Sequence, residues 1–211
     1  RQDPFNNNAT ITVNVQGGGN PNLKPEKADT LGIGGVLQPS FFPGFTASVD
    51  YWRIDVKDII GSQTGPLNLC FQGYTQFCSL FQRVVQSGVA LVIEQNVPVN
   101  LARTIVAGID FDATYRLDLA DVSDKFAGKT TFHFIATNNL QNLRDPILTP
   151  AVDFVGENQG SSGDGGLVRW NWSATLTYNL DPIDLSFTAR GITGGNLGAT
   201  FVQCTTGCPV S

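Results

Sequence analysis

The feature that most constrains the fold is a strict two-residue alternation of apolar and polar side chains, which recurs in about six segments of the chain. The clearest segment runs from Ile109 to Asp118, where apolar residues alternate with Asp, Thr and Arg. Successive side chains of a β-strand point to opposite faces of its sheet, so the pattern predicts an all-β, antiparallel fold whose strands have one dry and one wet face. The expected strands lie near residues 28–38, 44–57, 103–117, 129–139, 167–179 and 184–194.

The connections between these segments alternate between short and long. Short turns follow the first, third and fifth expected strands, whereas long loops near residues 58–101 and 140–166 follow the second and fourth. This order places both long loops on one side of the sheet, as in a transmembrane β-barrel with short periplasmic turns and longer extracellular loops. The expected strands, at about ten to fourteen residues, are also long enough to cross a bilayer at a tilt.

Aromatic residues gather toward the ends of the strands, which is the distribution that two membrane interfaces select. The expected interface aromatics are Phe45, Tyr51, Tyr115, Phe132, Trp170, Trp172 and Tyr178. Charge is costly against lipid, so the polar positions are expected to line the lumen of the barrel. These lumen-facing residues are Asp50, Asp110, Asp112, Arg116, His133, Arg169 and Arg190. A soluble antiparallel sandwich, which usually has shorter strands and no one-sided order of loops, is the alternative fold.

Composition excludes several classes of function. The formal net charge is −5 and the 13 Lys and Arg residues are scattered, which argues against nucleic-acid binding. Sequence patterns of catalytic sites are absent, so we expect neither enzymatic activity nor a cofactor. We interpret His133, the one histidine, as a hydrogen-bonded wall residue rather than a metal ligand or base. Asp110 and Asp112 share a face and can hold a cation, but hydration or pairing with Arg116 is the preferred role.

Four cysteines fall in two close pairs, Cys70 with Cys78 and Cys204 with Cys208. Sequence alone does not fix their pairing, but local disulfides within two loops are preferred, which implies an oxidising compartment. A four-thiolate zinc site is the alternative, although neither spacing matches the usual short zinc-binding motifs. The first pair encloses loop residues that can either contact a ligand or pack the loop against its neighbours: Phe71, Gln72, Tyr74, Gln76 and Phe77.

Two stretches carry a family resemblance, NPNLKPEKADTLGIGG from Asn20 and GFTASVDYWRIDVKDII from Gly44. Together with VAGIDFDATYRLDL and VRWNWSATLTY, they resemble the barrel region of TonB-dependent outer-membrane receptors over essentially the whole chain. The resemblance implies that residues 1–27 and 196–211 are extracellular loops and that residues 28–195 belong to the barrel. It also implies that Lys24 and Glu26 anchor the first loop to the barrel rim by hydrogen bonds or ion pairs.

Members of this family resemble one another in an N-terminal plug, a short energy-coupling box and a barrel of about twenty-two strands. About six strands cannot close a barrel, so we expect the chain to be part of a longer protein. The resemblance implies active uptake of a scarce nutrient, a siderophore, an oligosaccharide or cobalamin, across the bacterial outer membrane. The implied partners are the rest of the receptor, the TonB-ExbB-ExbD complex, the nutrient and outer-membrane lipid. A passive porin or adhesin-type barrel and a soluble extracellular β-sandwich binding module remain the alternatives.

Overall fold

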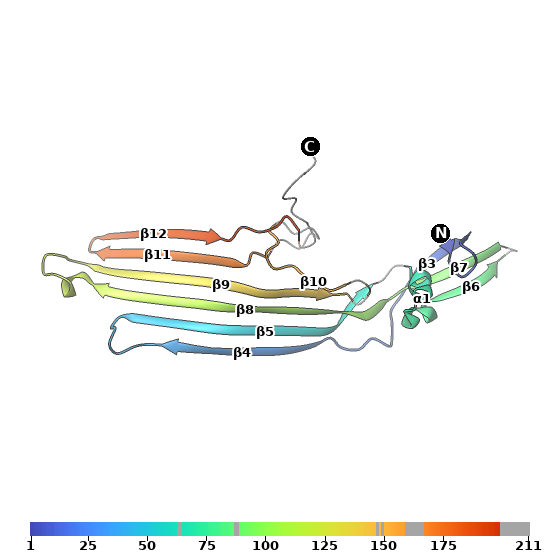
Figure 1. The fold of residues 1–211 in the computed structure, drawn as a ribbon, viewed down its shortest axis with the longest axis horizontal. Coiled ribbons are helices and arrows are strands. Elements are labelled where there is room, and N and C mark those ends of the chain that lie inside the picture. The colour runs from blue at the N-terminus through green and yellow to red at the C-terminus, as the bar shows by residue number, and fades with distance from the viewer. Residues whose placement is uncertain (63–64, 87–88, 147, 149, 159–166, 199–211) are drawn as a thin grey trace, which may run out of the picture. The chain divides into compact units, whose positions relative to one another are not determined.

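The computed structural model describes residues 1–62, 65–86, 89–146, 148, 150–158 and 167–198 (Figure 1). The chain divides into two compact units, each of which combines segments that are distant in the sequence. Unit 1 comprises Arg1–Lys27 and Lys57–Ala102, and unit 2 comprises Ala28–Val56 and Arg103–Ser211.

Unit 2 is built on one sheet with the strand order β12-β11-β9-β8-β5-β4, and β10 pairs with β9. The strands are β4 (Lys27–Leu37), β5 (Phe45–Ser62), β8 (Pro98–Asp118), β9 (Lys129–Asp145), β10 (Val152–Asp153), β11 (Trp170–Leu180) and β12 (Ile183–Ile192). The pairs β8–β9, β9–β11 and β11–β12 are antiparallel. Within the described part of the chain the sheet is open, with β4 and β12 at its two edges (Figure 1).

Directly paired residues of neighbouring strands lie on the same face of a sheet. In β8, β9, β11 and β12 the pairing mostly sets apolar residues opposite apolar residues and polar residues opposite polar ones. One row across the strands is apolar and consists of Tyr115, Phe132, Leu176 and Phe187. The adjacent row, on the opposite face, is polar and consists of Thr114, His133, Thr175 and Thr188. Phe132, Leu176 and Phe187 are 43%, 49% and 71% exposed. The sheet therefore has a polar face and an apolar face that the described protein leaves largely uncovered.

An aromatic cluster lies where β4 is joined to β5 by a short turn. Phe42 stacks on Tyr115 with ring centroids 4.8 Å apart, and it also contacts Phe45 at 5.5 Å. Gly44 has a φ of 82°, and the Arg116 backbone N–H donates to its carbonyl at 2.9 Å. A Cβ atom at Gly44 would lie 2.1 Å from the Arg116 carbonyl oxygen, so this turn requires glycine both for its conformation and for its contact with β8.

The opposite strand ends are joined by longer connections, and here the ladder between β8 and β9 is interrupted. The register between β8 and β9 shifts between Ala107 and Gly108, which pair with Gln141 and Asn139. Leu140 is therefore the extra residue of a β-bulge. Beyond it, β9 continues to Asp145 and β8 begins at Pro98, so both strands run further into the expected long loops than the alternation indicated.

Residues 1–27 and 58–101, which the sequence analysis expected to form loops, contain the strands and helices of unit 1. Its strands are β1 (Gln2–Asp3), β2 (Ala9–Thr10), β3 (Thr12–Gly17), β6 (Phe81–Gln86) and β7 (Val89–Asn96), and its helices are α1 (Pro66–Phe71) and the 3-10 helix η1 (Thr75–Leu80). β7 lies between β3, which is parallel to it, and β6, which is antiparallel. These elements are too short to produce a clear period, which is why the pattern did not reveal them.

The core of unit 1 contains Leu67, Phe77 and Val92, none of which has any exposed surface. A disulfide between Cys70 and Cys78 joins α1 to η1, with the two Cα atoms 4.9 Å apart. It closes the segment that presents Phe77 to the core, so the crosslink and the buried ring stabilise the same turn. Cys204 and Cys208 lie outside the described residues.

The pairing of Trp172 with Gly191 on the sheet leads to a first prediction. A Cβ atom at Gly191 would lie 2.5 Å from the Trp172 indole, whereas one at Gly32 on β4 would meet nothing within 4 Å. Gly191→Ala should therefore destabilise the folded protein by about 1–3 kcal/mol through displacement of the indole. Gly32→Ala should have little effect. Urea titrations of the full-length protein, followed by the shift in electrophoretic mobility between folded and unfolded forms, would measure both, and equal midpoints would contradict the prediction.

Candidate functional site

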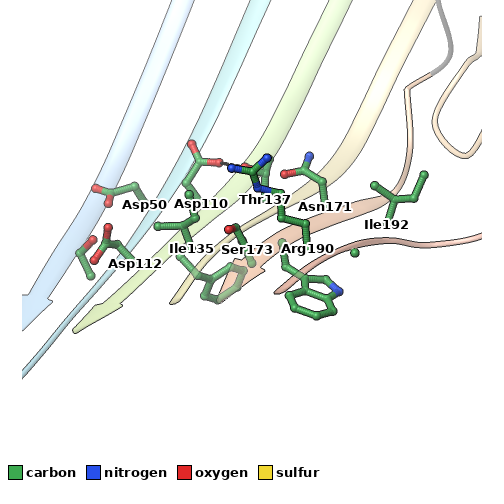
Figure 2. A pocket seen from close by; sticks show the side chains of 14 residues that line it. Asp50, Asp110, Asp112, Ile135, Thr137, Asn171, Ser173, Arg190 and Ile192 are labelled. Atoms are coloured by element: carbon green, nitrogen blue, oxygen red, sulfur yellow. Dashed lines mark hydrogen bonds between the residues drawn. The ribbon is translucent and has the colours of Figure 1, made fainter. Parts of the chain in front are cut away.

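The polar face of unit 2 contains a hollow of about 720 Å³ between side chains of β5, β8, β9, β11 and β12 (Figure 2). Its polar lining includes three carboxylates, one guanidinium group and several neutral groups: Asp50, Asp110, Asp112, Arg190, Thr137, Asn171 and Ser173. Ile135 and Ile192 add apolar surface. The Thr137 hydroxyl donates to Asp110 at 2.7 Å, which orients that carboxylate within the wall. A concave site of this size, lined mainly by polar residues, is of the kind that accommodates a small polar solute.

His133 lies on the same polar face of the sheet, next to this hollow. Its Nε2 atom is 3.0 Å from Asp112 Oδ2, and both side chains are about half exposed. The contact forms an ion pair when the imidazole is protonated and a hydrogen bond when it is neutral with Nε2 protonated. Among the described residues, no group of three or more His, Cys, Asp or Glu side chains is placed to hold a metal ion.

The structure brings together only some of the polar residues that the sequence placed in the lumen. Asp50, Asp110, Asp112 and Arg190 line the hollow, and His133 reaches it through Asp112. Arg116 instead lines a separate hollow of about 290 Å³ near Phe42 and Gln38. Arg169 is exposed and precedes β11, where its backbone carbonyl accepts a hydrogen bond from Asn139 N–H at 2.8 Å.

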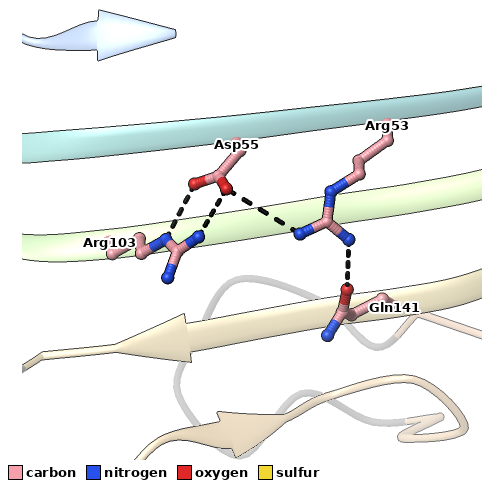
Figure 3. Close-up of polar contacts among 4 residues, drawn as sticks. All are labelled: Arg53, Asp55, Arg103 and Gln141. Atoms are coloured by element: carbon pink, nitrogen blue, oxygen red, sulfur yellow. Dashed lines mark hydrogen bonds and ion pairs between the residues drawn. The ribbon is translucent and has the colours of Figure 1, made fainter. Parts of the chain in front are cut away.

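A second polar cluster, which the sequence analysis missed, connects β5, β8 and β9 (Figure 3). Arg103 binds Asp55 through two parallel hydrogen bonds, with Nε 2.8 Å from Oδ1 and Nη2 bonded to Oδ2. Arg53 approaches the same carboxylate at 3.8 Å and donates to Gln141 Oε1 at 3.1 Å. Asp55 is only 8% exposed, so its charge depends on these guanidinium groups for compensation.

The only signal for this cluster in the sequence is the break in the alternation of β5. There Ile54 and Val56 lie between Arg53, Asp55 and Lys57, so the apolar positions change parity. The partner Arg103 is 48 residues from Asp55 in the sequence, and no local pattern indicates that pairing.

The expected interface aromatics form contacts along the strands. Trp170 stacks with Phe111 at 5.7 Å and Trp172 with Phe134 at 6.5 Å, both toward the end of β11 that follows the longer connection. At its other end the Tyr178 hydroxyl donates to the Ala127 carbonyl at 2.9 Å. Phe45, Tyr115 and Phe132 lie near the short connections, and Tyr51 lies within β5.

Unit 1 contains the residues that the sequence assigned to ligand contact. Phe71, Gln72 and Gln76 are exposed, and Tyr74 is half-buried with its ring 6.5 Å from that of Phe77. Phe77 itself is completely buried, which favours packing, the second of the two roles that the sequence left open for it. A ring that fills the core of unit 1 has no surface to offer a ligand, and its role is packing.

The segment from Asn20 to Glu26 is held by amide and carboxylate hydrogen bonds within unit 1. Glu26 Oε1 accepts from the Ile60 backbone N–H at 2.8 Å, which confirms Glu26 as an anchor. Lys24 anchors through its backbone, because its N–H and its carbonyl both bond the Asn100 side chain at 2.9 Å. The Asn20 amide donates to the Pro98 carbonyl at 3.0 Å.

A family model described as the TonB-dependent receptor-like β-barrel matches residues 2–206. The chain belongs to this family. Neither the curated proteins nor the solved structures yield a match to it. Receptors of this family are outer-membrane transporters, and the two-faced antiparallel sheet of unit 2 is consistent with a part of their barrel. No helix in the described ranges is both long and apolar enough to traverse a membrane.

The Asp55 cluster of this receptor leads to a second prediction. Asp55→Asn removes the buried charge that two guanidinium groups share and leaves them facing one another, so the urea midpoint of the full-length receptor should fall. Asp118→Asn is the matched control, because Asp118 contacts Lys129 at 3.8 Å where both side chains are well exposed. A midpoint for Asp55→Asn that equals that of the control would contradict a stabilising role for the cluster.

Proposed function

We propose that the chain forms part of the wall of an active outer-membrane transporter, with the apolar face of unit 2 against lipid and the polar face toward a water-filled lumen. The observation that carries this proposal is the separation of apolar and polar rows across β8, β9, β11 and β12. A basic residue on the lipid face costs about 2–4 kcal/mol at the middle of the bilayer. The carboxylates and Arg190 of the polar face therefore belong in the lumen.

The exposed apolar row favours this function over a soluble sandwich. In a sandwich Phe132, Leu176 and Phe187 would be buried against a second sheet, but they remain 43–71% exposed. Lipid supplies the missing apolar surroundings. Under this proposal residues 28–195 belong to a barrel of about twenty-two strands, and residues 1–27 and 196–211 are extracellular.

Family membership supports the transport mechanism. The nutrient, a siderophore, an oligosaccharide or cobalamin, binds from the extracellular side, and the TonB-ExbB-ExbD complex supplies energy for its release inward. The hollow around Asp110, Asp112 and Arg190 gives the wall hydrogen-bonding groups along this path. The exposed residues Phe71, Gln72 and Gln76 of unit 1 are candidate first contacts.

A third prediction is that the full-length receptor transports its nutrient actively. Uptake of radiolabelled nutrients by cells that express the receptor would test it. We expect accumulation of one nutrient above its external concentration, and a fall to background when TonB is deleted. A passive porin would instead equilibrate the nutrient with or without TonB. Recovery of the protein in a detergent-free soluble fraction would contradict the membrane assignment altogether.

A further inference from the structure

Unit 1 contains a hollow of about 380 Å³ whose lining differs in character from that of the polar face of unit 2. Phe5, Ile11 and Leu91 supply apolar surface, and Asp3, Asn6 and Arg83 supply polar groups. These residues come from β1, from the segment between β1 and β3, and from β6 and β7. A concavity of this volume that combines apolar surface with a few polar groups is a usual form of a small-molecule site.

Arg83 is held in one orientation. Its Nε and Nη2 atoms donate to the two oxygens of Asp3 at 3.1 and 2.8 Å, and Asp3 is 1% exposed. Its guanidinium carbon also lies 5.1 Å from the ring centroid of Phe5 and 6.0 Å from that of Phe81. A bidentate pair with a buried carboxylate and two aromatic contacts together leave the guanidinium group little freedom. Nη1 makes no hydrogen bond to any residue that the structure describes, and the Arg83 side chain is 45% exposed, which allows these N–H groups to meet a ligand.

The same carboxylate also positions Phe5. Asp3 Oδ1 accepts from the Phe5 backbone N–H at 3.0 Å, and the Asp3 carbonyl accepts from the N–H groups of Asn6 and Asn8 at 3.1 and 3.0 Å. The Phe5 ring packs edge-on against Phe71 with centroids 5.1 Å apart, yet the residue is 46% exposed. One buried residue, Asp3, therefore fixes both an aromatic ring and a hydrogen-bond donor at the edge of the hollow.

The charge of this arrangement indicates what it can bind. The positive charge of Arg83 is balanced by Asp3 at hydrogen-bonding distance, so the pair offers directed donors without a net charge. An anion gains little there, because the Asp3 carboxylate repels it. A ligand ring with an apolar face gains binding free energy by packing against Phe5. An oxygen at the edge of the same ligand ring can accept a hydrogen bond from Arg83 Nη1.

We propose that this hollow binds an uncharged ring that has one apolar face and an acceptor oxygen at its edge, either an aromatic amide or a sugar. The proposal rests on the proposed function, because it assigns this chemistry to part of the nutrient that the receptor takes up. Asp3 is a positioning residue, whereas Phe5 and Arg83 contact the ligand directly.

Saturation-transfer NMR on the purified full-length receptor, in a detergent without sugar headgroups, would test the site. The probes are benzamide, methyl glucoside and benzoate, which represent an uncharged aromatic ring, a sugar ring and a charged analogue of the first. We expect transfer to benzamide or methyl glucoside, and weaker binding of benzoate than of benzamide. Phe5→Leu keeps the apolar volume but removes the flat ring, and it should weaken binding about three- to tenfold.

Phe126→Leu is the matched control, since Phe126 is 56% exposed, close to the 46% of Phe5, and does not line the hollow. Both variants should retain the electrophoretic mobility of the folded receptor. Absence of saturation transfer to every probe, or equal weakening by the two variants, would overturn the site. If the Phe5→Leu receptor takes up the nutrient as well as the unaltered receptor does, and uptake still requires TonB, the site is overturned but the transporter assignment stands. Binding that depends on Phe5 in a receptor without TonB-dependent uptake would support the site and contradict the proposed function.

Discussion

Register between neighbouring strands is the constraint on which the rest of unit 2 depends. Each strand alternates by itself, but only continuous pairing from β8 to β12 assembles the separate alternations into two chemically different faces. A slip of one residue in β9 would place His133 in the row of Tyr115 and Leu176, and would move Phe132 to the polar face. The polar hollow and the apolar face both follow from that register.

The departures from regular pairing lie beside the Asp55 cluster. The alternation of β5 changes parity near Arg53, and the ladder between β8 and β9 has its bulge at Leu140. The Asp55 cluster lies in the same region and connects these three strands by charge and hydrogen bonds. These contacts link the three strands, and they compensate the charges of Arg53, Asp55 and Arg103 within the sheet.

Alternation predicted the strands of unit 2 well, because each is long enough to show its period several times. The segment from Ile109 to Asp118 alone indicated which residues share a face. Unit 1 was not predictable in this way, since α1 has six residues and its core depends on contacts between distant segments. The role of Phe77 stayed open in the sequence for the same reason, because nothing local distinguishes its buried ring from the exposed ring of Phe71. Arg103 and Asp55, and likewise Arg83 and Asp3, are pairs that only the fold brings together.

The most direct test of this account is the accessibility of nitroxide labels placed one at a time at residues 131–136 of β9, in the full-length receptor reconstituted in lipid. The measurement compares relaxation by oxygen, which concentrates in the bilayer, with relaxation by a water-soluble nickel chelate. The account predicts a period of two, with oxygen dominant at residues 132, 134 and 136 and the chelate dominant at residues 131, 133 and 135. Uniform accessibility to the chelate along the strand would contradict it, because both faces of the sheet would then lie in water.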